Sequence, residues 1–472
     1  MTVPEPSARE WLRRLDGGQL SARELVEHVL ARCDRANPFV NALAARDDEA
    51  ALRAADDADD ARRRGDRRPL LGLPLTVKDS LETAGLATSS GSWARAAFVP
   101  KRDATVVARV RAAGAVIVAK TNVPEYTWSY ETDNAVLGRT LNPHDPARTC
   151  GGSSGGEAAL LGADASVAGI GTDGGGSIRV PSHYCGTAGL RTTAGLVPET
   201  GCWPPTRATG MLDMNAVGPM ARFVGDLGLL LPVLAGRDGL DPFVQGVAPG
   251  DPDEVDVAGL RVGFYAADGV FPVSSETAAA VRGAARALDA DGCTVEEARP
   301  PDLGAATELF FALMAADGGA QARADTAAAE PRHVEQFSRL LENLRPLALD
   351  AAGLFALVRR MFELRAAVRA FVDAYDVVVC PVAPGHAPPH GCTPGDETPL
   401  ESYLAFNYTH AFSIAGLPVA VVRVGDSGGL PVGVQVVAGA FRDHVAVAVA
   451  AALERDLGGF APPSRDTARA PA

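Results

Sequence analysis

Two glycine-rich stretches decide the fold of this chain: Cys150-Gly-Gly-Ser-Ser-Gly-Gly156 and Gly171-Thr-Asp-Gly-Gly-Gly-Ser-Ile-Arg-Val-Pro181. Glycine tolerates positive φ and lets a ligand approach the backbone N–H groups closely. Successive N–H groups in such a turn form a concavity that suits a phosphate or the oxyanion of acyl transfer. Ser177 directly follows the second run of glycines, so its hydroxyl could attack a carbonyl whose oxygen these N–H groups hold.

A serine nucleophile needs a base, and the sequence offers one lysine in a suitable position. The short apolar run Gly72-Leu-Pro-Leu-Thr-Val77 ends at Lys78 and predicts a buried strand. Desolvation at the end of such a strand favours the neutral amine, which can accept a proton. Plainer readings stay open for each piece alone: a tight turn for the glycines, a solvated strand end for Lys78 and a helix N-cap for Ser153.

The rest of the chain alternates short apolar strands with helices, a pattern typical of an α/β fold. Strands are expected at 115–119, 165–170, 260–264, 377–380, 419–424 and 433–437, and helices at 21–34, 47–63, 105–113, 156–161, 276–288 and 445–453. We expect a single large domain whose mixed, mostly parallel central sheet is covered by helices on both faces. Along the sequence it divides into an N-terminal helical region, a core and a remainder: 1–70, 71–235 and 236–472, the last with a mainly helical stretch at about 303–375.

Composition excludes several classes of function. The 44 Lys and Arg against 58 Asp and Glu give a net charge of −14, which argues against a nucleic-acid surface. No apolar run approaches the about 18 residues that span a membrane, and residues 1–16 lack the apolar region of a secretory signal. Seven scattered cysteines suit free thiols in a reducing compartment, so a cytoplasmic location is expected.

In its two glycine-rich stretches the chain resembles the amidase signature family of hydrolases. The resemblance covers about residues 20–455 and is densest at 73–196. Further matching segments are Val77-Lys78-Asp79, Lys120-Thr-Asn-Val-Pro124, Asn142-Pro143, Cys185-Gly186, Gly189-Leu190, Gly218-Pro-Met220 and Ala415-Gly-Leu-Pro418. The resemblance implies the amidase signature fold and hydrolysis of a carboxamide C–N bond, with esters as additional substrates, and no metal or other cofactor.

The resemblance also implies a catalytic triad in which Ser177 is the nucleophile, Ser153 is a bridging serine on a cis peptide and Lys78 is the general base. Neutral Lys78 would take the proton of Ser153 as Ser153 takes that of Ser177. The implied oxyanion hole consists of the N–H groups of Gly174, Gly175, Gly176 and Ser177. Three further residues match the motif and are assigned supporting roles: Ser154, Asp173 and Arg179.

The expected substrate pocket is largely aromatic. By alignment with the family, its side chains are Thr127, Trp128, Tyr130, Trp203, Phe406 and Tyr408, with the helical stretch at about 303–375 as one wall. This set favours an apolar or aromatic acyl group and an uncharged amide. Two positions depart from the family: Gly174 replaces a larger residue, and His144, interpreted as a packing residue, replaces a frequent aromatic one.

Three other interpretations were weighed. Gly152-Ser-Ser154-Gly-Gly156 satisfies the nucleophile-elbow pattern with Ser154 as nucleophile, but the proline-broken loop 142–150 stands where that fold needs a strand. His410 and His386, the imaginable bases for such a site, are both read as polar loop residues. A non-catalytic anion- or nucleotide-binding module lacks the usual phosphate-loop motifs, and no HExxH or Cys/His cluster indicates a metal.

Within the family, the chief alternative is the glutaminase-type subunit of a tRNA-dependent amidotransferase. Such relatives carry an Arg- and Ser-containing stretch where this chain has Gly189-Leu-Arg-Thr-Thr-Ala-Gly-Leu-Val-Pro-Glu-Thr-Gly-Cys-Trp-Pro-Pro205. The mismatch favours a stand-alone amidase. The expected partner is a small amide, with neither nucleic acid nor membrane, and a homodimer is left open.

Overall fold

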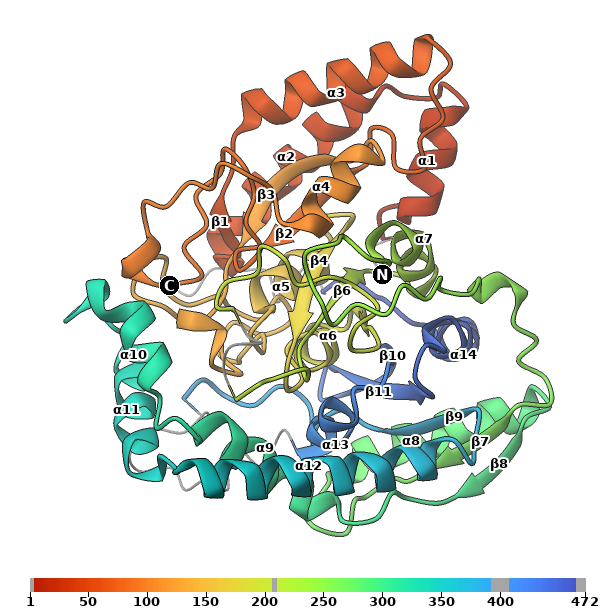
Figure 1. The fold of residues 1–472 in the computed structure, drawn as a ribbon. Coiled ribbons are helices and arrows are strands. Elements are labelled where there is room, and N and C mark those ends of the chain that lie inside the picture. Colours follow the sequence, from red (N-terminus) through yellow and green to blue (C-terminus); the bar gives the residue numbers. More distant parts are fainter. Residues whose placement is uncertain (1–3, 206–209, 392–406, 464–472) are drawn as a thin grey trace.

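The computed structural model describes residues 4–205, 210–391 and 407–463. Within these ranges, eleven strands form one sheet in the order β1-β3-β2-β4-β6-β5-β10-β11-β9-β7-β8 (Figure 1). The strands are β1 (Leu43–Ala45), β2 (Pro74–Lys78), β3 (Val116–Thr121), β4 (Ala168–Asp173), β5 (Ala188–Arg191), β6 (Ala216–Ala221), β7 (Arg261–Phe264), β8 (Thr294–Glu297), β9 (Val377–Pro381), β10 (Val419–Ser427) and β11 (Leu430–Ala438).

The sheet is mixed, as expected, but its antiparallel share is larger than the sequence suggested. Strand β2 runs parallel to β3 and β4, and β7 runs parallel to β8 and β9. The other six pairings are antiparallel. One of them is a hairpin between β10 and β11, turned by Gly428 and Gly429, both at positive φ, as a two-residue hairpin requires.

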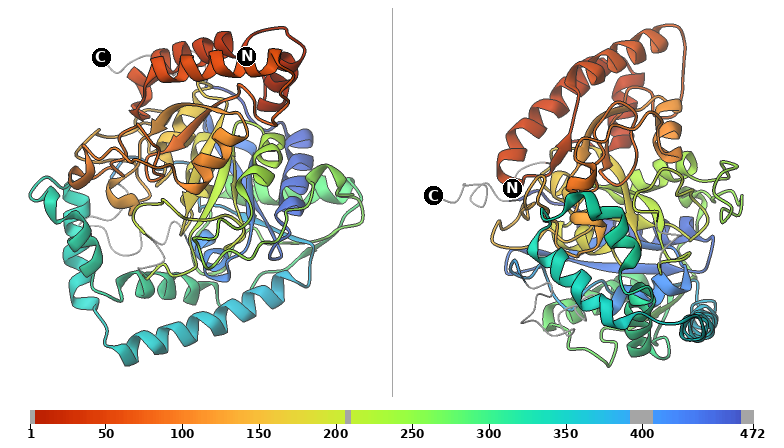
Figure 2. Two further views of the ribbon diagram at one scale, coloured as in Figure 1. Left: turned by 45° about the horizontal axis from the view of Figure 1, so that its top comes forward. Right: turned by 60° about the vertical axis from the view of Figure 1, so that its left-hand side comes forward.

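Helices cover both faces of this sheet (Figure 2). Alternate residues of β10 separate the two sides: Ala420 and Val422 pack in the large core that includes α7, α8 and α14, whereas Val419 packs with α9, α12 and α13. The helices are α1 (Ala8–Asp16), α2 (Ala22–Val40), α3 (Asp48–Arg63), α4 (Thr105–Ala112), α5 (Gly155–Gly162), α6 (Arg179–Cys185), α7 (Val224–Leu234), α8 (Ser275–Ala290), α9 (Leu303–Ala315), α10 (Ala320–Thr326), α11 (Glu335–Leu344), α12 (Ala351–Val372), α13 (Asn407–Ala415) and α14 (Asp443–Leu457).

The expected helical stretch at about 303–375 consists of α9 to α12, which wrap one side of the molecule (Figure 2). Strands from all three sequence regions, 1–70, 71–235 and 236–472, join the single sheet. The boundaries between these regions therefore stay a prediction. None of the helices in the described ranges combines the length and apolar character needed to cross a membrane.

The topology brings the two glycine-rich stretches together. Strands β2 and β4 are parallel neighbours, so Lys78 at the end of β2 and Asp173 at the end of β4 lie at the same edge of the sheet. The first glycine-rich stretch leads into α5 and the second leads from β4 into α6. Ligand sites of α/β sheets are commonly built at the carboxyl ends of parallel strands.

Candidate active site

Lys78 is completely buried at the end of β2. Its Nζ atom lies 2.7 Å from Ser153 Oγ, 2.7 Å from Thr172 Oγ1 and 3.2 Å from the Thr172 carbonyl oxygen. Burial lowers the pKa of Lys78 to about 7, although the negative charge of Asp173 acts in the opposite direction. A large fraction of Lys78 is therefore uncharged at neutral pH, as a general base requires.

The three serines of the two glycine-rich stretches lie around this amine. The Gly152–Ser153 peptide bond is cis. Ser154 joins the two stretches, because its N–H donates to the Ser177 carbonyl at 3.0 Å and its hydroxyl donates to the Thr172 carbonyl at 3.2 Å. Ser153 and Ser177 line the same cavity, and among the described residues no hydrogen bond connects their hydroxyls. The structure thus contains the Lys78–Ser153 contact of the implied relay and places Ser177 beside it.

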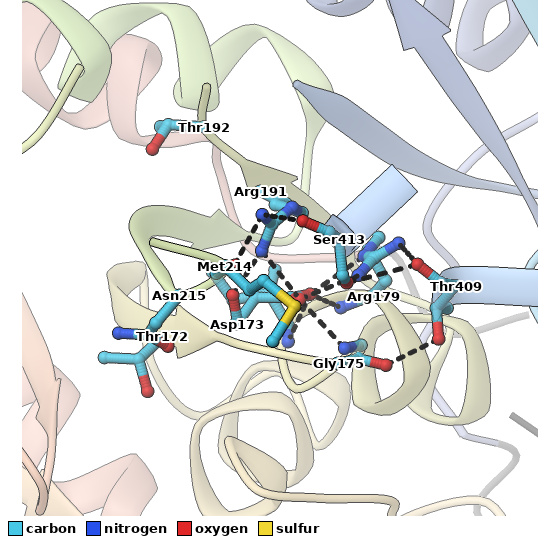
Figure 3. A network of polar contacts seen from close by, with 12 residues as sticks. Thr172, Asp173, Gly175, Arg179, Arg191, Thr192, Met214, Asn215, Thr409 and Ser413 are labelled. Atoms are coloured by element: carbon cyan, nitrogen blue, oxygen red, sulfur yellow. Dashed lines mark hydrogen bonds and ion pairs between the residues drawn. The ribbon is translucent and has the colours of Figure 1, made fainter. Parts of the chain in front are cut away.

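Asp173 organises the second glycine-rich stretch (Figure 3). Its carboxylate accepts hydrogen bonds from Arg179 Nε at 2.9 Å, Arg179 Nη2 at 2.8 Å and Arg191 Nη1 at 3.3 Å, and also from the N–H groups of Gly176 and Ile178. Burial alone would raise the pKa of Asp173, but the two guanidinium groups hold it well below its usual range. The predicted supporting residues Asp173 and Arg179 therefore form a charged, fully buried brace.

One of the four implied oxyanion donors is already occupied. The Gly176 N–H donates to Asp173 Oδ1 at 2.9 Å, and Gly176 has φ of 131°, a conformation that favours glycine. Within the described part of the chain, the N–H groups of Gly174, Gly175 and Ser177 donate to no protein acceptor. These three N–H groups remain available to a ligand.

The cavity beside these groups has a volume of about 210 Å³. Four of the predicted pocket residues line it: Thr127, Trp128, Tyr130 and Trp203. Tyr408 does not, because its side chain packs in the core with α9 and α12, and Phe406 lies outside the described residues. The helical stretch contributes one wall of the cavity through side chains of α9, α11 and the following turn: Phe310, Phe311, Met314, Leu340, Leu344 and Leu347.

Met211 and Asn215 also line the cavity, and sequence analysis missed both of them. Met211 occupies the space that a larger residue at position 174 would fill, since a Cβ atom on Gly174 would overlap Met211 Cε. Asn215 Nδ2 donates to Glu199 Oε2 at 3.0 Å. The glycine at 174 was the available signal, because it indicated that some other side chain fills this space.

The described lining of the cavity contains no Asp, Glu, Lys or Arg side chain. It consists of apolar and aromatic side chains with a few neutral polar groups. A cavity of this kind favours an uncharged ligand, because an ionised group would lose its hydration without gaining a partner.

The histidines considered as alternative bases lie elsewhere. His144 is buried as a packing residue, with Nε2 3.1 Å from the Cys185 carbonyl oxygen. His386 occupies a bend, with Nδ1 3.2 Å from the Ala387 carbonyl oxygen. The reading of His410 as a polar loop residue was wrong, since it is fully buried within α13.

Comparison with known proteins agrees with this geometry. The sequence model of the Amidase family matches residues 24–447. This chain belongs to the amidase signature family. The match spans both glycine-rich stretches and all the residues placed around Lys78, so the resemblance and the fold class expected from the sequence are confirmed.

Relatives of this amidase-family protein differ in their reactions. It is 33% identical to a glutamyl-tRNA(Gln) amidotransferase subunit of Synechococcus sp. (strain WH7803), over 94% of this chain and 96% of the relative. Among solved structures, 6-aminohexanoate cyclic dimer hydrolase in complex with substrate superposes with a TM-score of 0.86 at 28% identity, covering 96% of this chain and 97% of the other. A structure described as an amidase superposes with a TM-score of 0.82 at 30% identity, covering 96% of this chain and 100% of the other.

Proposed function

We propose that this protein is a stand-alone amidase that hydrolyses uncharged carboxamides through an acyl-enzyme on Ser177. The observation that carries the proposal is the contact of 2.7 Å between the buried Lys78 amine and Ser153 Oγ, beside a cavity that Ser177 also lines. A neutral amine has two hydrogens, which the Thr172 hydroxyl and carbonyl oxygens can accept. Its lone pair is then left for the Ser153 proton.

In the proposed reaction, Ser177 Oγ attacks the amide carbon as its proton passes to Ser153 Oγ, whose own proton passes to Lys78 Nζ. The C–N bond then breaks, and the proton returns through Ser153 to the leaving nitrogen. Water attacks the resulting ester by the same relay in reverse and releases the carboxylic acid and free Ser177. Activated esters would acylate Ser177 by the same route.

The oxyanion of each tetrahedral intermediate is assigned to the N–H groups of Gly174, Gly175 and Ser177. These groups come from a loop that Asp173 braces, so they need no reorganisation as the charge develops. Removing one such donor from an enzyme costs on the order of 3 kcal/mol of transition-state stabilisation. Gly176, which the family resemblance also implied, is assigned to the brace instead because its N–H is bound to Asp173.

The substrate class follows from the cavity lining. Trp128, Trp203, Phe310 and Met314 provide apolar surface, and the described lining offers no cation for a substrate carboxylate. We therefore assign an aromatic or alkyl acyl group and a neutral amide. Strong selectivity for amides that carry a free carboxylate would contradict this assignment.

A panel of aryl, alkyl and carboxylate-bearing amides and their esters, assayed with wild type and Ser177→Ala, tests the proposal. We expect Ser177→Ala to lose all measurable turnover while its thermal unfolding stays close to that of wild type. Ser129→Ala, which removes another hydroxyl from the same cavity, is the matched control and should stay active. Turnover retained by Ser177→Ala would refute the assigned nucleophile.

The curated relatives support a second candidate, the glutaminase subunit of a tRNA-dependent amidotransferase, at 33–35% identity over at least 93% of this chain. Glutamine would bring a carboxylate and an ammonium group into a cavity whose described lining is uncharged. Glutaminase activity in the panel, or a second subunit that co-purifies with the chain at a fixed ratio, would favour this candidate over the stand-alone amidase.

A further inference from the structure

A buried chain of hydrogen bonds lies behind the glycine loop that carries Ser177. Tyr130 Oη is 3.0 Å from the Gly175 carbonyl oxygen and 2.8 Å from His410 Nε2. His410 Nδ1 is 3.2 Å from Thr307 Oγ1. The chain links α9 and α13 to the oxyanion loop, and His410 is fully buried within it.

The directions of the protons follow from what each group can donate. A carbonyl oxygen only accepts, and a tyrosine hydroxyl has a single hydrogen. When Tyr130 donates to Gly175, its oxygen must accept from His410 Nε2–H, and His410 Nδ1 then accepts from Thr307. Burial lowers the pKa of His410 to about 3, so the ring stays neutral, with one donor and one acceptor nitrogen.

The Gly175–Gly176 peptide is held from both sides. Its carbonyl accepts from Tyr130 and, at 2.6 Å, from Thr409 Oγ1, while its N–H donates to Asp173 Oδ1 at 2.9 Å. Fixing this peptide plane also fixes the direction of the flanking N–H groups of Gly175 and Ser177. These are two of the three groups assigned to the oxyanion.

We propose that His410 is a positioning residue that, through Tyr130, holds the oxyanion loop in its catalytic geometry. This inference rests on the proposed acyl-enzyme function. His410 acts at second hand: its ring stacks on Phe310, with centroids 4.3 Å apart, and Phe310 in turn lines the cavity. The ring therefore also contributes to packing, and a test has to separate packing from the hydrogen bond.

His410→Gln and His410→Asn make this separation. Both substitutions remove the ring and its stacking on Phe310. The glutamine amide nitrogen reaches about as far as Nε2 and can donate to Tyr130, whereas the asparagine amide reaches only about as far as Nδ1. We expect the kcat of His410→Gln to stay within about threefold of wild type and that of His410→Asn to fall about tenfold or more, with KM little changed.

Tyr130→Phe removes the middle of the chain without removing a buried ring, and we expect its kcat to fall as in His410→Asn. His183 supplies the matched control, because it is a buried histidine that bonds to the Gly385 carbonyl and the Gly433 N–H rather than to the oxyanion loop. His183→Gln and His183→Asn should differ little in kcat.

Equal losses in His410→Gln and His410→Asn, or full kcat in Tyr130→Phe, would overturn the inference and leave packing as the role of His410. If His410→Asn does not fold, as judged by thermal unfolding, the kcat of Tyr130→Phe decides. Turnover that survives in Ser177→Ala is a different result, because it refutes the proposed function itself.

Discussion

The acid limb of the pH–rate profile follows from the burial of Lys78. An exposed lysine with a pKa of 10.5 would be neutral in only about 1 of 3,000 molecules at pH 7. Burial lowers the pKa of Lys78 to about 7, so about half of the molecules carry a neutral amine at that pH. Because only the neutral amine accepts a proton, kcat/KM should fall as the pH drops through about 7. At pH 5, about 1% of the plateau value should remain.

Glu157 makes the origin of this limb testable. It is fully buried, burial raises its pKa to about 7, and its negative charge raises the pKa of Lys78. Its carboxylate accepts hydrogen bonds from the hydroxyls of Thr76 and Thr121, one of which a glutamine oxygen can keep. In Glu157→Gln we therefore expect the acid limb to persist and to move to lower pH.

The assay is kcat/KM for a neutral amide between pH 5 and 9, for wild type and Glu157→Gln, with circular dichroism at each pH to verify the fold. A wild-type profile that stays flat down to pH 5 would refute Lys78 as the base. A limb that disappears in Glu157→Gln would assign the titration to the carboxyl group rather than to the amine.

Two further predictions concern the loop around Ser177. Asp173→Asn leaves Arg179 and Arg191 buried without their carboxylate, so it should lower the free energy of unfolding by about 3–5 kcal/mol in urea titrations; a loss below about 1 kcal/mol would contradict the brace. Gly174→Ala should push Met211 into the cavity and lower kcat/KM for a bulky aromatic amide about tenfold, and the double variant with Met211→Ala should recover it; an additive loss would refute the steric pairing.

Much of the fold could be read from residue patterns. Apolar runs predicted the strands that became β2, β3, β9 and β11, because strands buried on both faces are continuously apolar. The predicted strand at 165–170 begins three residues too early, since β4 spans Ala168–Asp173. The antiparallel pairings were not predictable, because a short apolar run looks the same in either direction. The exposed β8 has no apolar face to reveal it.

The site was predictable where the residue order carries the chemistry. Lys78, Ser153 and Asp173 were predictable because each stands within a distinctive local motif. Met211 and His410 were not, because each is an ordinary core residue type whose role depends on contacts with distant segments. Met211 matters through a missing side chain at Gly174, and His410 through Tyr130, from which 280 positions separate it.

The central claim is that Ser177 becomes acylated while Lys78 and Ser153 move its proton. The most direct measurement is mass spectrometry of peptides after treatment with a fluorophosphonate probe, which forms a stable adduct with an activated serine. The account predicts one adduct on Ser177 in wild type, none in Ser177→Ala, and much slower labelling in Lys78→Ala. An adduct on Ser154 instead, as the nucleophile-elbow interpretation requires, or labelling that does not depend on Lys78, would contradict it.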